Sequence, residues 1–222
     1  MRAWKISASS DRGYEPRVFS FFVNAATGRL IFARDEVYHG APIDGHVSGM
    51  ATPGVLPDVA SNPVVDTPLT DLFVRDVLGN LATTDSDGNF SLDGDGTEIL
   101  LSALLAGPFV EVRDSQVPPP FLTQTVGPPG PADFVFNTTP GEFTTAQVNA
   151  MVQVNRTHDF YRHYQPDFDQ LDRPVTANVN SSAMSCNAFF TPVGFSVNFF
   201  AADARCVNTA YSSVVNHEYG HF

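Results

Sequence analysis

Residues 217–221 read His-Glu-Tyr-Gly-His, and this stretch decides how the C-terminal part of the chain is expected to fold. On an α-helix, positions i and i+4 lie on one face about one turn apart, so His217 and His221 can ligate the same zinc ion, Zn2+. Glu218 would lie beside that ion, where its carboxylate can take a proton from a water molecule. The motif therefore predicts His217 and His221 as metal ligands and Glu218 as the catalytic base. Two surface histidines on a terminal helix are the structural alternative.

The residues before the motif predict the helix that carries it. Asn208 is a suitable N-cap, and Ala210, Val214, His217 and His221 follow at spacings of four, three and four. These positions form one stripe, which predicts that the side of the helix that packs against the protein also presents both imidazoles inward. Imidazoles that are splayed apart or that point into bulk solvent would contradict a zinc site.

A segment upstream adds a resemblance to a known family. Residues 187–190 read Asn-Ala-Phe-Phe and lie 30 residues before His217, and they resemble the Asn-Ala-Phe-Trp/Tyr edge strand of thermolysin-like zinc peptidases. In that family the edge strand pairs with the backbone of the substrate, a β-augmentation mode of binding. The resemblance implies that Asn187 and Ala188 bind substrate. For Asn187, fixing a turn is the structural alternative.

Residues 155–161 resemble the N-x-x-H-D-x-x-Y region of the fungalysin-like branch, although Tyr161 comes one residue early. A histidine paired with its neighbours in the fold is the structural alternative for His158. Together these motifs resemble a thermolysin-like or fungalysin-like zinc metallopeptidase (gluzincin) precursor that is truncated at its C-terminus. The resemblance implies a zinc-dependent endopeptidase that hydrolyses protein or peptide substrates. It also implies that a glutamate beyond Phe222 is the third zinc ligand.

Two other functions stay open. Metzincin peptidases also contain a glycine in the position of Gly220, but their motif continues as H-E-x-x-H-x-x-G-x-x-H. The chain could also act only as a non-catalytic binding module, made of a propeptide remnant and a β-sandwich. A catalytic zinc site needs three protein ligands and the motif contains two, so the truncated chain itself is expected to be inactive.

Composition restricts the partners of the protein. The 222 residues include 24 acidic and 12 basic side chains, and the formal net charge of −12 disfavours nucleic acids and anionic membranes as partners. No apolar run approaches the roughly 18 residues of a transmembrane helix, and residues 1–20 contain no signal peptide. We expect a monomer that is secreted and acts outside the cell.

The two cysteines support an oxidising compartment. Cys186 and Cys206 flank an expected hairpin with strands at 187–191 and 195–201. If these strands pair, their outer ends approach each other, and a disulfide becomes geometrically reasonable. Two free buried thiols are the alternative. Zinc ligation by both cysteines together with histidines is disfavoured, because the sequence has no C-x-x-C pair.

The sequence predicts an α+β protein whose first two parts are all-β. Residues 1–40 resemble the tail of a PepSY-type propeptide, a β-hairpin remnant with a Gly28 turn. Residues 43–115 are expected to form a small β-sandwich that resembles carboxypeptidase-regulatory-like domains. Its expected strands are 46–51, 70–77, 90–92, 98–104 and 109–112.

Residues 116–140 are rich in proline, which predicts a stiff linker. Residues 141–222 then resemble the N-terminal half of a zincin catalytic domain. A helix capped by Thr144 or Thr145 is expected to run to about residue 163, followed by a strand at 175–185, the hairpin and the HExxH helix.

Overall fold

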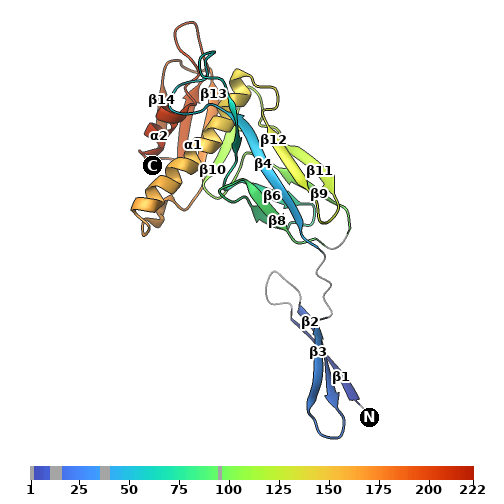
Figure 1. Cartoon of the computed structure of the whole chain (residues 1–222). Coiled ribbons are helices and arrows are strands. Elements are labelled where there is room, and N and C mark those ends of the chain that lie inside the picture. The colour runs from blue at the N-terminus through green and yellow to red at the C-terminus, as the bar shows by residue number, and fades with distance from the viewer. Residues whose placement is uncertain (1–2, 11–16, 36–40, 95–96) are drawn as a thin grey trace.

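The computed structural model describes residues 3–10, 17–35, 41–94 and 97–222 (Figure 1). Within these ranges the chain forms four β-sheets and two α-helices. Strands dominate, so the α+β expectation is confirmed in its coarse form. None of the described helices is both long enough and apolar enough to cross a membrane.

The first sheet contains β1 (Ala3–Ser10), β2 (Arg17–Asn24) and β3 (Leu30–Asp35), in that order and all antiparallel. The expected turn is present: Gly28 has a φ of +67°, which favours glycine. The side chain of Asn24 accepts the backbone N–H of Ala26 at 2.9 Å and of Thr27 at 3.1 Å, which stabilises the turn. The described part of residues 1–40 is thus one three-stranded sheet. Its resemblance to the tail of a PepSY-type propeptide stays a prediction.

Two further sheets form the β-unit after residue 41. One has the order β12-β4-β5 with β8 also paired to β4, and the other has the order β11-β9-β6-β7. Inward residues of both sheets, such as Val47 and Leu101, belong to one hydrophobic core. The strands are β4 (Ile43–Ala51), β5 (Val65–Pro68), β6 (Phe73–Asp76), β7 (Leu81–Thr83), β8 (Asn89–Leu92), β9 (Ile99–Ala103), β11 (Leu122–Val126) and β12 (Ala132–Phe136). The sequence missed β5 and β7, which are four and three residues long.

The linker predicted for residues 116–140 is wrong. β11 pairs antiparallel with β9, and β12 pairs in parallel with β4. Phe134 and Phe136 of β12 are 3% and 0% exposed, and buried and exposed positions alternate along this strand. The prolines lie before, between and after the two strands, where the lack of a backbone N–H costs no ladder hydrogen bond. This region therefore completes the core of the β-unit.

The boundary predicted at residue 115 is also wrong, because β10 (Val110–Asp114) belongs to the fourth sheet. This sheet has the order β10-β13-β15-β14, and β10 pairs in parallel with β13. Its other strands are β13 (Val175–Ser181), β14 (Ala188–Thr191) and β15 (Ser196–Phe200). The chain thus leaves the β-unit to form β10 and returns to it for β11 and β12, so the two predicted domains are interleaved.

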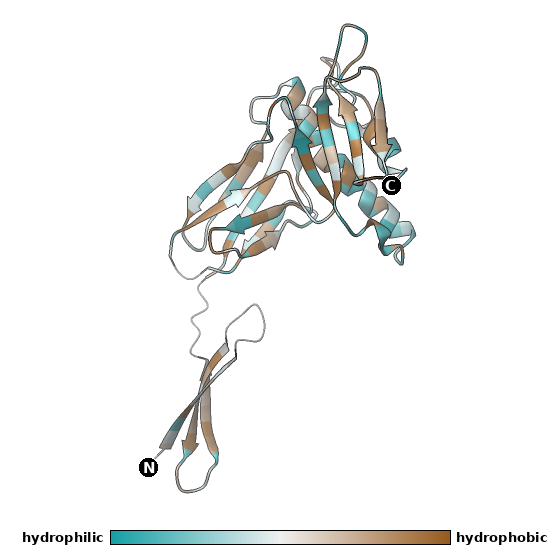
Figure 2. Ribbon diagram, turned by 180° about the vertical axis from the view of Figure 1, so that it is seen from behind, coloured by the Kyte–Doolittle hydropathy of each residue, from teal (hydrophilic) through white to brown (hydrophobic). Residues whose placement is uncertain are grey.

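The predicted long helix is confirmed as α1 (Glu142–Tyr164), although Gly141 is its N-cap. The hydroxyl of Thr144, the third helical residue, accepts the backbone N–H of Gly141 at 3.2 Å. α1 contacts β4, β10, β13 and the second helix, and nearly every residue from Thr145 to Asn155 is buried. Figure 2 shows hydrophilic residues among the apolar ones along this helix. α1 thus packs against both the β-unit and the fourth sheet. A short 3-10 helix, η1 (Asp169–Leu171), follows it.

Candidate metal centre

The first three residues of the HExxH motif lie on α2 (Ser212–Tyr219), and Gly220 and His221 follow its last residue. The helix begins later than the sequence predicts. Thr209 donates its backbone N–H to Phe200 at 3.0 Å, which keeps the chain extended beside β15. The amide of Asn208 donates to Asn180 at 2.7 Å, and its side-chain oxygen accepts the backbone N–H of Ala210 at 3.0 Å, which closes a local turn ahead of the helix. Tyr211 is the N-cap instead, without a side-chain hydrogen bond.

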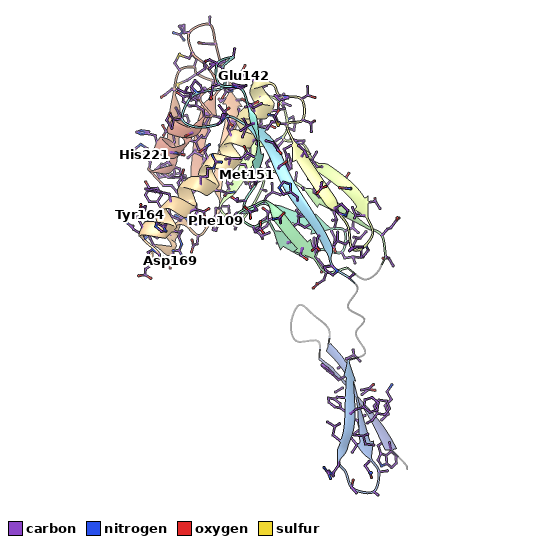
Figure 3. All side chains as sticks on the ribbon, viewed as in Figure 1. Phe109, Glu142, Met151, Tyr164, Asp169 and His221 are labelled. Atoms are coloured by element: carbon purple, nitrogen blue, oxygen red, sulfur yellow. A yellow bond between two sulfur atoms is a disulfide. The ribbon has the colours of Figure 1, made fainter. Side chains whose placement is uncertain are left out.

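The prediction that the imidazoles point inward is wrong. The buried residues of α2 are Ser212, Val215, Glu218 and Tyr219, whereas His217 and His221 are exposed. Each helical residue turns the side-chain direction by about 100°, so a shift of one position changes which face is buried. Val215 and Tyr219 bury more apolar surface than two imidazoles could, and this burial selects the observed face. Figure 3 shows His221 at the surface of the molecule beside α2.

The two imidazoles nevertheless lie next to each other. The ring centroids of His217 and His221 are 5.0 Å apart, with an angle of 87° between the ring planes. Gly220 keeps helical backbone angles (φ −63°, ψ −14°), and His221 donates its backbone N–H to the carbonyl of Glu218 at 3.2 Å. The i, i+4 spacing is therefore preserved although α2 ends at Tyr219. The two rings are therefore adjacent, as a shared zinc ion requires, but the described residues do not shield them from solvent.

Phe222 holds the chain directly after His221. Its ring contacts the rings of Phe190, Phe195 and Tyr219, with centroid distances of 5.9, 5.5 and 5.5 Å. The guanidinium of Arg173 lies 5.2 Å from the centroid of Phe222, within the range of a cation–π contact. Aromatic side chains at both ends of a two-residue segment thus fix the backbone of His221.

If His217 and His221 hold Zn2+, as the motif predicts, replacing Phe222 by alanine is expected to weaken that binding by about 10-fold, because His221 loses the contact that orients it. Isothermal titration with Zn2+ measures the change in affinity. The matched control is Phe121→Ala, since Phe121 is 62% exposed. Equal Zn2+ affinity in the Phe222 variant and the control would contradict this anchoring role.

The predicted substrate-binding residues lie beside the motif. A hollow of about 620 Å3 is lined by Asn187, Ala188, Phe189, Phe190, Pro192, His217, Glu218 and His221. β14 forms the edge of its sheet and pairs only with β15, so the other side of its backbone is unpaired within the described sheet. The fold thus brings together all five residues that the sequence assigns to catalysis, metal binding and substrate binding.

A second hollow, of about 640 Å3, adjoins the first and shares Asn187, Ala188, His217 and Glu218 with it. Its other walls come from the disulfide and from the segment before α2. Glu218 is only 8% exposed. It nevertheless contributes to the walls of both hollows beside His217.

The disulfide predicted between Cys186 and Cys206 is confirmed, with the Cα atoms 5.3 Å apart. It joins the residue before Asn187 to the loop that leads to α2. A disulfide is compatible with an extracellular location, where such bonds persist.

His217 and His221 fit two of the three protein positions of a catalytic zinc site. Within the described ranges, the only group of three metal-ligating side chains with mutually close donor atoms is Cys186, Asp203 and Cys206. Its two sulfurs are joined to each other, so this group is not a third ligand for the histidines.

His158 has the surroundings of a structural histidine. It is 4% exposed, and its Nε2 lies 3.2 Å from a carboxylate oxygen of Asp172. Its Nδ1 lies 3.4 Å from Asp159, and its ring stacks on Phe109 with a centroid distance of 3.5 Å. These contacts join α1 to η1 and to the turn before β10, which accounts for the residue without a ligand.

Sequence reasoning did not predict that Tyr219, inside the HExxH motif, belongs to the hydrophobic core. This residue is 1% exposed, and burial, together with the negative charges of Asp172 and Asp159, raises the pKa of its hydroxyl. A signal for it exists in the sequence: Val215, Tyr219 and Phe222 follow each other at spacings of four and three, as on one helical face.

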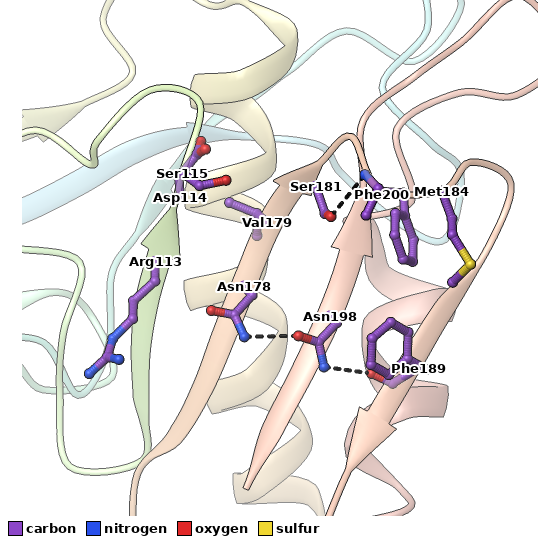
Figure 4. A pocket seen from close by; sticks show the side chains of 11 residues that line it. Arg113, Asp114, Ser115, Asn178, Val179, Ser181, Met184, Phe189, Asn198 and Phe200 are labelled. Carbon is purple, nitrogen blue, oxygen red and sulfur yellow. Dashed lines mark hydrogen bonds between the residues drawn. The ribbon is translucent and has the colours of Figure 1, made fainter. Parts of the chain in front are cut away.

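A further hollow, of about 600 Å3, lies on the fourth sheet. Figure 4 shows a ladder across it, in which the amide of Asn178 donates to Asn198 at 2.8 Å and Asn198 donates to the carbonyl of Phe189 at 3.1 Å. Its one carboxylate, Asp114, already accepts hydrogen bonds from Gln147 and Asn180. No histidine lines it, so it offers no catalytic group comparable to those on α2.

Comparison with models of known protein families and with curated proteins finds no match to the chain. The side chains on α2 and along β14 are therefore the basis for assigning a function.

Proposed function

We propose that this protein is a zinc-dependent endopeptidase in which His217 and His221 bind the metal and Glu218 is the general base. The observation that carries the proposal is the adjacency of the two imidazoles, 5.0 Å apart between centroids, beside the nearly buried Glu218. The two imidazoles share a hollow with this carboxylate and with residues of the edge strand β14.

Zn2+ bound there would supply a Lewis acid that polarises the scissile carbonyl and lowers the pKa of water. Glu218 then takes a proton from the attacking water and passes it to the leaving amine. The low exposure of Glu218 limits competition from solvent at its carboxylate.

The proposed substrate is an extended segment of a protein or peptide. The free side of β14 can pair with its backbone, since an edge strand presents unpaired N–H and C=O groups. Asn187 and Ala188 stand at the start of this edge and line both hollows, so they would contact the residues next to the cleaved bond.

Replacing His217 by alanine tests the metal site. Isothermal titration of the oxidised chain is expected to give one Zn2+ per chain, and His217→Ala should weaken binding by about 100-fold or more. This estimate follows because losing a residue that merely orients a ligand already costs about 10–100-fold in affinity. His163→Ala is the matched control, because His163 is also an exposed histidine at the end of a helix.

A non-catalytic binding module is the second candidate, and the exposure of both imidazoles favours it. This function predicts that the wild-type protein, His217→Ala and His163→Ala give the same Zn2+ titration curve. None of the three would then bind Zn2+ stoichiometrically. That result would overturn the peptidase proposal.

A further inference from the structure

The disulfide loop contains donor atoms that the proposed peptidase mechanism does not use. The sulfurs of Cys186 and Cys206 and a carboxylate oxygen of Asp203 all lie within 4.8 Å of one another. Oδ1 of Asp203 is 4.0 Å from the sulfur of Cys186. A disulfide sulfur carries no proton and is a poor metal ligand, so this cluster cannot hold a cation while the S–S bond exists.

The S–S bond is open to reduction. Cys186 is exposed and Cys206 is partly exposed, so a small dithiol can reach the bond. The thiolate of the dithiol attacks one sulfur and the other sulfur leaves as a thiolate, which gives a mixed disulfide. The second thiol of the reagent then displaces the remaining cysteine. In total the protein gains two electrons and two protons, and the reagent leaves as a cyclic disulfide.

Hydrogen bonds hold the two cysteines near each other without the S–S bond. The Asp203 carboxylate accepts the backbone N–H of Arg205 at 2.7 Å and of Cys206 at 2.9 Å, and the backbone N–H of Asp203 donates to the carbonyl of Cys206 at 2.9 Å. Nη2 of Arg205 donates to the hydroxyl of Ser185 at 2.7 Å, which connects this loop to the residue before Cys186. These contacts do not involve the S–S bond, so we expect the loop to keep its shape and its distance from Cys186 after reduction.

Both ends of the segment are also anchored in the fourth sheet. β14 begins two residues after Cys186 and pairs with β15. On the other side, Thr209 follows Cys206 by three residues and bonds to Phe200 through both its backbone and its hydroxyl. Reduction thus releases one covalent bond within a framework that other contacts maintain.

We propose that reduction converts this disulfide into a binding site for a thiophilic divalent cation, Zn2+ or Cd2+, ligated by the thiolates of Cys186 and Cys206 and by the carboxylate of Asp203. Cysteine thiolates bind Zn2+ at about 2.3 Å and carboxylates at about 2.0–2.2 Å. Donor atoms within 4.8 Å of one another can surround one such ion with small side-chain movements. Soft thiolate ligands also select these metals over Mg2+ and Ca2+.

Asp203 is suited to the role because its side chain is partly exposed and one of its carboxylate oxygens lies close to both sulfurs. Oδ1 of Asp203 keeps the loop through the backbone N–H groups of Arg205 and Cys206. Oδ2 accepts the exposed guanidinium of Arg205, through Nε at 3.4 Å and Nη2 at 3.1 Å, so a metal that binds Oδ2 displaces an interaction that costs little to lose.

The site is independent of the histidine pair but adjoins it. Both cysteines line the second hollow together with His217 and Glu218. A metal held there would change the wall that faces the proposed substrate. Under reducing conditions, zinc uptake would therefore report two sites, whereas the oxidised chain would report only the histidine pair.

Cd2+ titration of the full chain tests the proposal, before and after reduction with a dithiol that is then removed under inert gas. The reduced chain is expected to show thiolate-to-metal charge-transfer absorption in the ultraviolet that saturates at one thiolate-bound Cd2+ per chain, and the oxidised chain is expected to lack this absorption. The double variant Cys186→Ser/Cys206→Ser should abolish the band. Asp203→Asn should weaken binding by about 10-fold or more.

His217→Ala is expected to leave the band and its titration unchanged, which separates this site from the proposed peptidase centre. A reduced chain without the band, a band that persists in the double variant, or unaltered affinity in Asp203→Asn would overturn the proposal. Loss of the native circular dichroism spectrum on reduction would also overturn it, because the site requires the loop to keep its shape.

Discussion

Replacing Phe136 by alanine is expected to lower the free energy of unfolding by about 3–5 kcal/mol, the usual cost of removing a fully buried phenylalanine. Phe136 is 0% exposed and pairs across β12 and β4 with Gly49. A Cβ atom added at Gly49 would lie 2.9 Å from Val148 of α1 and 3.3 Å from Phe136, so these elements pack tightly here. The cavity left by the ring cannot close without moving α1.

Thermal unfolding monitored by circular dichroism measures this effect, and a loss of that size lowers the melting temperature of a chain of this length by roughly 6–20 °C. The matched control is Phe121→Ala, in the same proline-rich region but 62% exposed, which should change stability by no more than about 0.5 kcal/mol. If both variants melted together with the wild type, residues 116–140 would behave as a linker and the described packing of β12 would be wrong.

Replacing Glu218 by glutamine is expected to reduce peptide hydrolysis by about 10²–10⁴-fold, the typical contribution of a positioned general base. The amide keeps the shape of the side chain but cannot accept a proton from water. Since Glu218 is not a proposed ligand, the affinity for Zn2+ should stay within about 2-fold of wild type. The assay measures the rate at which Zn2+-loaded protein hydrolyses a quenched fluorescent peptide. It requires a form of the protein whose wild-type sequence shows measurable turnover.

The control for this substitution is Glu98→Gln, which changes the same functional group at an exposed position outside both hollows. Unchanged turnover in Glu218→Gln would refute its role as a base. Loss of Zn2+ together with turnover would instead make Glu218 a metal ligand.

Local sequence patterns predicted most of the elements near the candidate site. The apolar strands on either side of Pro192-Val193-Gly194 became β14 and β15, and the pairing of these strands brings Cys186 and Cys206 within bonding distance. The helical spacing before residue 163 correctly indicated α1, although the helix begins after Gly141 and not at the predicted cap of Thr144 or Thr145. The hairpin and the disulfide join residues no more than 20 positions apart, so local sequence patterns were enough to predict them.

The interleaving of the β-unit with the fourth sheet was not predictable in the same way. Prolines dominate residues 116–140 and suggest a linker, whereas the alternation of Ala132, Phe134 and Phe136 has meaning only once β4 lies alongside. Likewise, β10 contains the same apolar alternation as its neighbours, and its parallel partner β13 lies about 65 residues further along the chain.

By itself, the sequence determined that two imidazoles stand one helical turn apart and that two cysteines close a hairpin, because helix period and strand pairing are set by local backbone geometry. The tertiary structure decided which face of α2 is buried. Val215, Tyr219 and Phe222 bury more apolar surface against α1 and the fourth sheet than the opposite face could, so the helix turns the imidazoles outward, toward the hollow along β14. That competition for burial depends on surfaces that distant parts of the chain provide.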